Sequence, residues 1–328
     1  MFRGIALKIA ATFVFALMSA AIKTVAARFP VAEVVLFRSA FALVVLVAWL
    51  AARGEFPAAL HTRRPLGHVG RSLMGMGGMF ANFVALSFLP LAAATAFTFA
   101  TPLIVVVLAA LLLHETVRPY RWAAVAIGFV GVMVMLSESL GSGLGGAAAA
   151  SPATIGAMVA LAGAVASAAA MIQTRRLTLS EATGAIVFYF STLTGVFSAL
   201  LLGVAALWPE GAPGAAFAIG QRFVAPSAWD LVLLVAVGLF GGAGQILMTH
   251  SYRYADASII AAFDYTAMLW ALALGVLLFG EAPSPRILLG ASIVVACGVA
   301  VLWREHRTRS ALRARASAPE PTLAATVR

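Results

Sequence analysis

The sequence has 328 residues, of which 62% are hydrophobic and only 10% charged, and its mean hydropathy is +1.01. Soluble globular proteins average about 25% charged residues, so this composition excludes that class and predicts helices that span a membrane. The formal net charge of +10 suits a nucleic-acid-binding protein, but the placement of the basic residues gives it another explanation.

Ten apolar segments, each about long enough to cross a bilayer, follow one another along the chain. They comprise residues 5–25, 34–52, 69–89, 91–113, 121–138, 153–173, 182–207, 229–250, 256–280 and 286–304. The first is longer than the hydrophobic region of a typical signal peptide, so it is predicted to be a retained span. The predicted fold class is an all-α membrane protein with no separate soluble domain.

Basic residues concentrate in alternate loops. With a cytoplasmic N-terminus, 17 of the 22 lysines and arginines fall on the cytoplasmic side. Lys23, Arg28, Arg222 and Arg286 fall outside, and Arg38 lies within the second span. This distribution follows the positive-inside rule and predicts a membrane protein with ten spans and both termini in the cytoplasm. The basic charge is thus mostly a topology signal, and no nucleic-acid partner is expected.

The two halves of the chain are related in sequence. Residues 70–115 align without a gap on residues 236–281, and each copy lies within a predicted set of five spans. Because five is odd, the second half must insert upside down relative to the first. We expect repeats at 1–138 and 153–304, a Gly- and Ala-rich linker at 139–152, and a basic, disordered tail at 305–328. Inverted repeats are typical of secondary transporters, whose substrate site lies near the midplane between the halves.

Short motifs recur at matching places in both halves. The first half has Pro90-Leu-Ala-Ala-Ala-Thr95, Thr101-Pro102-Leu103, His114-Glu115 and Gly128-Phe-Val-Gly131; the second has Tyr252-Arg-Tyr-Ala-Asp256-Ala-Ser258, Gly280-Glu281 and Gly290 to Gly298. This pattern resembles the drug/metabolite transporter superfamily, in its EamA-type branch of ten-span carriers. His114 replaces the usual glycine, and Met268 stands where the first half has Pro102.

The string SYRYADASIIAAFDYTAMLWALALG, residues 251–275, resembles a sub-branch that includes bacterial riboflavin importers and carriers of S-adenosylmethionine. Other members of the superfamily export amino acids, metallophores or drugs. The resemblance makes riboflavin uptake the first candidate function. Uptake of S-adenosylmethionine and export of an amino acid or other metabolite are the alternatives.

Asp264 is the one acidic residue predicted to lie well inside an apolar span. A charged side chain at the helix centre costs about 2.5–3.5 kcal/mol on insertion scales, so Asp264 should face the bundle interior or a watery cavity. There it could couple transport to protons or pair with a cationic substrate group. The alternative is a structural hydrogen bond to a neighbouring helix.

Arg38 is the only basic residue predicted within a span and away from its edges, and it could bind an anionic substrate or pair with an acid. Alternatively it extends to the outer interface, which is about one and a half turns away. Glu33 is five residues away, so an ideal helix does not place the two side by side.

Glu115 and Glu281 end the fourth and ninth spans, where a carboxylate opposes the helix dipole. Each is expected to pair with a nearby arginine or cap the next helix, in a structural or gating role at opposite membrane faces. Asn82 and Gln245 offer hydrogen bonds to a substrate or to other helices. Several aromatic residues could line a cavity for a planar ligand or simply pack against lipid and protein. They include Phe97, Tyr189, Phe263, Tyr265 and Trp270.

The sequence contains no Walker loop, no paired cysteines, no HExxH and no G-x-S-x-G, so neither catalysis nor a cofactor is expected. The predicted partners are a small-molecule substrate, the lipid bilayer and protons as the coupling ion. A flippase for lipid-linked substrates is an alternative of another class, although a phosphate-binding groove should carry several basic residues within the spans. A purely structural scaffold would leave the inverted repeat and Asp264 unexplained.

Overall fold

The computed structural model describes residues 2–57, 61–112, 119–139, 152–177, 180–207, 222–254 and 266–316 as helices and the segments between them. The helices are α1 (Phe2–Val25), α2 (Val31–Ala52), α3 (Pro65–Phe88), α4 (Leu91–Thr98), α5 (Ala100–Leu112), α6 (Pro119–Ser139), α7 (Pro152–Leu177), α8 (Thr183–Leu207), α9 (Ala228–Tyr254), α11 (Thr266–Phe279) and α12 (Pro285–Ala316). Prolines open α3, α6, α7 and α12, because proline fits a first helical turn, where its missing N–H costs no helix bond.

These helices coincide with the predicted spans. In the described residues, α1, α2, α7, α8 and α9 are long and apolar enough to cross a membrane. Shorter apolar helices cover parts of the fourth, fifth, ninth and tenth predicted spans, and α3 forms the third. The ninth span is described from Thr266 onward. The sequence-based prediction of an all-α membrane protein is therefore confirmed.

The structure differs from the predicted elements in two places. The fourth span is divided at Phe99 into α4 and α5, since Pro102 has no N–H to offer the carbonyl of Thr98. The last helix continues to Ala316, so residues 305–316 of the expected disordered tail are helical. The arginines, alanines and leucine of this stretch are good helix formers, and lengthening an existing helix avoids the cost of nucleation.

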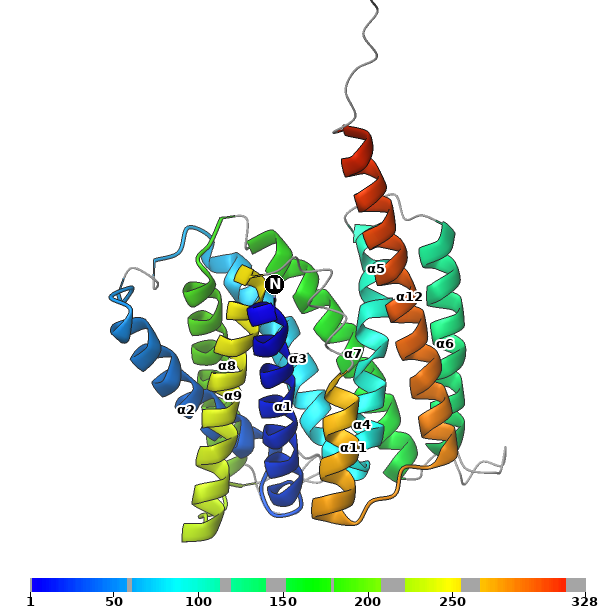
Figure 1. Cartoon of the computed structure of the whole chain (residues 1–328). Coiled ribbons are helices and arrows are strands. Elements are labelled where there is room, and N and C mark those ends of the chain that lie inside the picture. The colour runs from blue at the N-terminus through cyan, green and yellow to red at the C-terminus, as the bar shows by residue number, and fades with distance from the viewer. Residues whose placement is uncertain are drawn as a thin grey trace, which may run out of the picture.

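Equivalent helices of the two halves exchange partners across the bundle. α3 of the first half packs along α7 of the second, and α9 of the second packs along α1 of the first. α2 meets its counterpart α8, and α6 meets its counterpart α12. Figure 1 shows α2, α8 and α9 at one side of the bundle, α5, α6 and α12 at the other, and α1, α3, α7 and α11 between them. This exchange is the packing expected of two inverted repeats.

The glycines matched by the sequence repeat have matching neighbours. A Cβ atom on Gly78 of α3 would clash with Ser167 of α7, and one on Gly244 of α9 would lie 2.8 Å from the Phe15 ring of α1. Because no side chain fits at either place, both helix pairs approach closely, as small residues permit in membrane proteins. The sequence repeat and the packing thus describe the same symmetry.

The two ends of the bundle are distinct. α1 begins and α12 ends at the same end, which we term the terminal end (Figure 1). α1 and α3 end, and α9 begins, at the other, which we term the far end. Both halves contribute helices to each end, so contacts between the halves can hold either end closed.

Candidate functional site

A buried arginine lies at the crossing of α2 with α9. Arg38 is 6% exposed, so its side chain does not extend to the outer interface. A Cβ atom on Gly241, in the middle of α9, would lie 3.2 Å from Arg38 Nε, and glycine leaves room for the guanidinium there. Within the described residues, Nε and Nη1 of Arg38 have no hydrogen-bond partner. The structure therefore holds a positive charge near the middle of the bundle.

A second arginine reaches the same region from α3. The guanidinium carbon of Arg71 lies 4.1 Å from the centre of the Phe190 ring of α8, and that of Arg38 lies 5.7 Å from it. Nε of Arg71 donates a hydrogen bond to Thr174 Oγ1 at 3.2 Å, whereas its Nη1 has no partner among the described residues. Two like charges thus share one aromatic ring, to which each is attracted by a cation–π interaction.

Arg38, Arg71 and Phe190 form a cluster in which Arg38 and Phe190 occupy equivalent positions of the two repeats. Gly241 of α9 backs Arg38 of α2, and Gly75 of α3 backs Phe190 of α8, where a Cβ atom would lie 3.1 Å from the ring. Since Gly75 and Gly241 are matched in the sequence repeat, Phe190 occupies in the second half the place of Arg38 in the first. The cluster therefore lies where the two halves meet, as the binding sites of inverted-repeat carriers do.

The space beside Arg38 is small in this structure. A cavity of about 10 Å³ is lined by Arg38, Phe190, Ser191, Gly241 and Gln245, together with apolar residues of α2 and α8. This is about the room one water molecule needs, whereas ligand pockets measure about 300–1,000 Å³. The helices around Arg38 must separate before a metabolite can enter.

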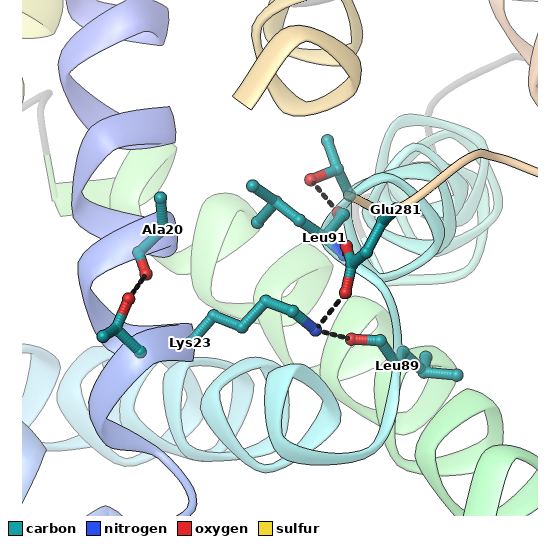
Figure 2. A network of polar contacts seen from close by, with 7 residues as sticks. Ala20, Lys23, Leu89, Leu91 and Glu281 are labelled. Atoms are coloured by element: carbon teal, nitrogen blue, oxygen red, sulfur yellow. Dashed lines mark hydrogen bonds and ion pairs between the residues drawn. The ribbon is translucent and has the colours of Figure 1, made fainter. Parts of the chain in front are cut away.

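Four groups from different helices are joined at the far end, and we term them the far-end latch (Figure 2). Nζ of Lys23, at the end of α1, lies 3.0 Å from Glu281 Oε1 and donates a hydrogen bond to the Leu89 carbonyl at 2.7 Å. Glu281 Oε2 accepts a hydrogen bond from the Leu91 N–H at 2.9 Å. The lysine thus faces the carboxyl end of α3 and the glutamate caps the amino end of α4, as helix dipoles favour. The latch connects the two repeats.

Local sequence directs Glu281 into this latch. Gly280 has φ of +63°, a left-handed conformation that ends α11, and the Glu281 N–H then bonds back to the Gly275 carbonyl at 3.0 Å. Glycine adopts this conformation without the penalty that a side chain brings. Next to the latch, a cavity of about 310 Å³ is lined by residues of α4 and of the α3–α4 and α11–α12 connections, including Pro90, Ala93 and Glu281.

Further polar contacts join the halves at the far end. Arg28 Nη1 lies 2.7 Å from Asp230 Oδ1, and Ser227 Oγ accepts a hydrogen bond from the Asp230 N–H at 3.2 Å as the cap of α9. The fully buried Glu33 accepts a hydrogen bond from the Val224 N–H at 2.9 Å. Glu33 is therefore held by the segment before α9.

The terminal end has its own connection between the halves. Glu181, between α7 and α8, accepts a hydrogen bond from the Arg63 N–H at 2.9 Å, and its Oε2 lies 3.6 Å from His68 Nε2 of α3. Burial raises the pKa of the Glu181 carboxyl, but the hydrogen bond from the Arg63 N–H and the nearby polar groups of His68 and Thr62 outweigh it and hold that pKa below its ordinary value of 4.5. The carboxylate therefore stays charged and bridges the halves.

The structure scatters the other predicted residues. Gln245 lies beside Arg38, but the Tyr189 ring lies 4.8 Å from that of His68, toward the terminal end. Phe97 has no exposed surface and belongs to the packed core, and half-buried Asn82 lies on α3 where it crosses α7. The Trp270 ring meets Phe13 edge-on at 5.1 Å.

Several predicted residues lie outside the described part of the chain. They are Glu115, Phe263, Asp264 and Tyr265. Thr266, the first described residue after Tyr265, shares a hydrogen bond of 2.8 Å with Thr12 of α1. Lys8, one helical turn from Thr12, is also buried. The roles predicted for the four residues stay predictions.

Sequence reasoning did not identify Arg71 and Phe190. Arg71 lies only two residues inside the third predicted span, which begins at 69, and is therefore counted among the cytoplasmic basic residues. Pro65 signals an earlier start that puts Arg71 nearly two turns inside the helix. Phe190 has no such signal, since its position depends on how α8 packs against α2 and α3.

An inverted pair of helical repeats with a charged cluster where they meet is the arrangement typical of membrane transporters. The EamA-like transporter family model matches residues 2–137 and 154–304, and the chain belongs to this family. The protein is therefore a multi-pass membrane transporter.

Its relatives transport different substrates. The chain is 29% identical to the pseudopaline exporter CntI of Pseudomonas aeruginosa, over 90% of this chain and 94% of that protein. It is 28% identical to the riboflavin transporter of Rhizobium johnstonii and 26% identical to the S-adenosylmethionine uptake transporter of Rickettsia prowazekii, in each case over 85% of this chain and at least 83% of the other. One crystal structure shares the fold with a TM-score of 0.62 and 21% identity, covering 90% of this chain and 94% of that one.

Proposed function

We propose that the protein is a secondary transporter that moves a small organic metabolite across the bacterial inner membrane by alternating access. In this proposal the terminal end faces the cytoplasm, as the distribution of lysine and arginine favours. One end opens at a time, the metabolite binds beside Arg38, and the halves then rearrange around it.

One observation supports this proposal most directly: the centre of the bundle is closed around Arg38, and separate polar contacts join the two halves at each end. The cavity at Arg38 holds about 10 Å³, so binding requires movement of the halves. The Lys23–Glu281 ion pair joins the halves at the far end, and Glu181 joins them at the terminal end. Breaking one set while keeping the other opens the centre to one side alone.

The driving force follows from the same sequence. With no nucleotide-binding motif in the chain, transport draws on an ion or substrate gradient. Asp264 is the residue proposed for coupling to protons. Riboflavin is the first candidate substrate, and S-adenosylmethionine, pseudopaline-type and amino-acid-type metabolites follow, in line with the relatives.

A growth assay tests substrate and coupling together. A riboflavin-auxotrophic bacterium without its own importer is grown at limiting riboflavin with wild type, Asp264→Asn, or Glu55→Gln as a carboxylate control in a loop. Growth with wild type and the control, but not with equally abundant Asp264→Asn, supports flavin import and a working Asp264. Growth with all three makes Asp264 structural. No growth with correctly inserted wild type rules out riboflavin uptake.

A further inference from the structure

Arg38 is buried and Arg71 is half-buried, and no carboxylate among the described residues neutralises either charge. Each charge inside a span costs about 2.5–3.5 kcal/mol on insertion scales. Neither arginine takes part in the ion pairs found among the described residues. Their proximity adds repulsion to this cost.

The contacts of Arg38 and Arg71 satisfy few of the N–H donors of their guanidinium groups. An arginine presents five N–H groups in a planar fork. Thr174 accepts one hydrogen bond from Arg71, and both guanidinium groups lie near the Phe190 ring. A cation–π contact contributes about 0.5–2 kcal/mol, which does not offset the burial of a charge. Nε and Nη1 of Arg38 and Nη1 of Arg71 are left without acceptors in the described residues.

We propose that Arg38 and Arg71 together bind an anionic group, a carboxylate or phosphate, of the transported metabolite. The proposal rests on the transport function above and assigns the substrate class. The fork of arginine matches both kinds of oxyanion with paired hydrogen bonds. Gln245 and Ser191 line the cavity beside Arg38 and add neutral polar groups for the rest of the molecule.

The positions of Arg38, Arg71 and Phe190 imply that movement of the two halves changes the anion site. Both arginines belong to the first repeat and Phe190 belongs to the second. In the closed arrangement the ring of one half stands against the cations of the other. When the halves separate, the guanidinium groups lose the ring and become available to the anion. Among the candidate substrates, this favours metabolites with acidic groups over the neutral flavin.

Anion binding is tested on the purified full chain in detergent by thermal unfolding. Citrate and inorganic phosphate are the soluble probes, with chloride at equal ionic strength as the reference, and phosphatidylglycerol vesicles are the lipid probe. The variants are Arg38→Gln and Arg71→Gln, with Arg53→Gln in an exposed loop pair as the matched control.

We expect citrate or phosphate to stabilise wild type and Arg53→Gln, with an apparent affinity at least tenfold weaker in the other two variants. Without anion, Arg38→Gln and Arg71→Gln should unfold at the same temperature as wild type or higher, because each removes a charge that no carboxylate among the described residues neutralises. A merely structural arginine would lower that temperature.

Equal stabilisation of all variants by anions would overturn the proposal, and so would a response to phosphatidylglycerol alone, which would indicate a lipid substrate. The proposal would also fail if Arg38→Gln lost stability and Asp264→Asn restored it, because the Asp264 carboxylate would then be the partner of Arg38.

Transport assays in proteoliposomes separate the proposal of an anion site from the proposed transport function. If riboflavin is taken up equally well by both arginine variants, the protein is a transporter but the anion site is refuted. If the protein binds anions but transports none of the probes, the anion site is supported and the proposed transport function is refuted.

Discussion

Replacing Glu281 by glutamine should release the far-end latch without disturbing its backbone bond. Glutamine keeps an oxygen that can accept the Leu91 N–H, but it removes the charge that Lys23 faces at 3.0 Å. The experiment therefore isolates the ion pair from the cap of α4.

The burial of the Lys23–Glu281 ion pair determines how much free energy is lost when the pair is broken. The side chains of Lys23 and Glu281 are 16% and 22% exposed, between the cases of a surface pair and a buried one. Exposed pairs contribute up to about 1 kcal/mol, and breaking a buried pair costs about 3–5 kcal/mol. Allowing for solvent screening, we expect a loss of about 1.4 kcal/mol, which is a tenfold shift toward the state open at the far end.

The assay is labelling of an introduced cysteine by a membrane-impermeant maleimide added from outside. The chain has one cysteine, the buried Cys297, and replacing it by alanine gives a background without native thiols. Ala94→Cys places a thiol one helical turn below Leu91, where the residue is fully buried in the closed arrangement. Ala225→Cys, in the exposed segment before α9, reports any general change in access.

Glu281→Gln should raise the labelling rate of the cysteine at position 94 about tenfold and leave the rate at position 225 unchanged. If the rate at position 94 stays within a factor of two of the parent, the ion pair does not hold the far end closed and the reasoning fails.

The remaining predictions concern stability, measured by thermal unfolding in detergent. Gly131→Ala puts a Cβ atom 2.7 Å from a carbonyl of α12 and should cost about 1–3 kcal/mol, whereas Gly203→Ala, with open space around it, should cost nothing; equal losses would contradict the packing. Ser227→Ala removes the cap of α9 and should cost about 0.5–2 kcal/mol, more than Arg28→Ala, since Arg28 is half exposed; the reverse order would be evidence against the cap. Because the pKa of Glu181 is lowered, its contribution is complete above pH 4.5 and is lost as pH falls through the lowered pKa; Glu181→Gln should remove this acid-side loss, and an unchanged pH profile would refute it.

The positions of the spans follow from the sequence because the bilayer imposes both their length and their apolar character. The repeat could also be predicted from the sequence, because Gly78 and Gly244 are matched in the sequence and pack against equivalent helices in the structure. The break at Phe99 and the continuation of α12 were missed, because apolar composition says little about where a helix divides or ends.

The candidate site was only partly predictable. Arg38 stands out as a charge in an apolar run, but its depth depends on the packing of α2 against α9, which local sequence does not specify. Glu281 follows from the repeat and the Gly-Glu step, yet its partner Lys23 lies 258 positions earlier in the chain. Phe190 becomes recognisable only when the two halves are placed together.

The central claim is that the two ends of the bundle open in turn. Pulsed electron paramagnetic resonance can measure it with spin labels on exposed residues, Ala27 and Ala282 at the far end and His61 and Ser180 at the terminal end, in the Cys297→Ala background with and without Glu281→Gln. The account predicts that the variant widens the far-end distance while the terminal-end distance stays short or shortens. Widening of both distances together would describe a channel and contradict alternating access.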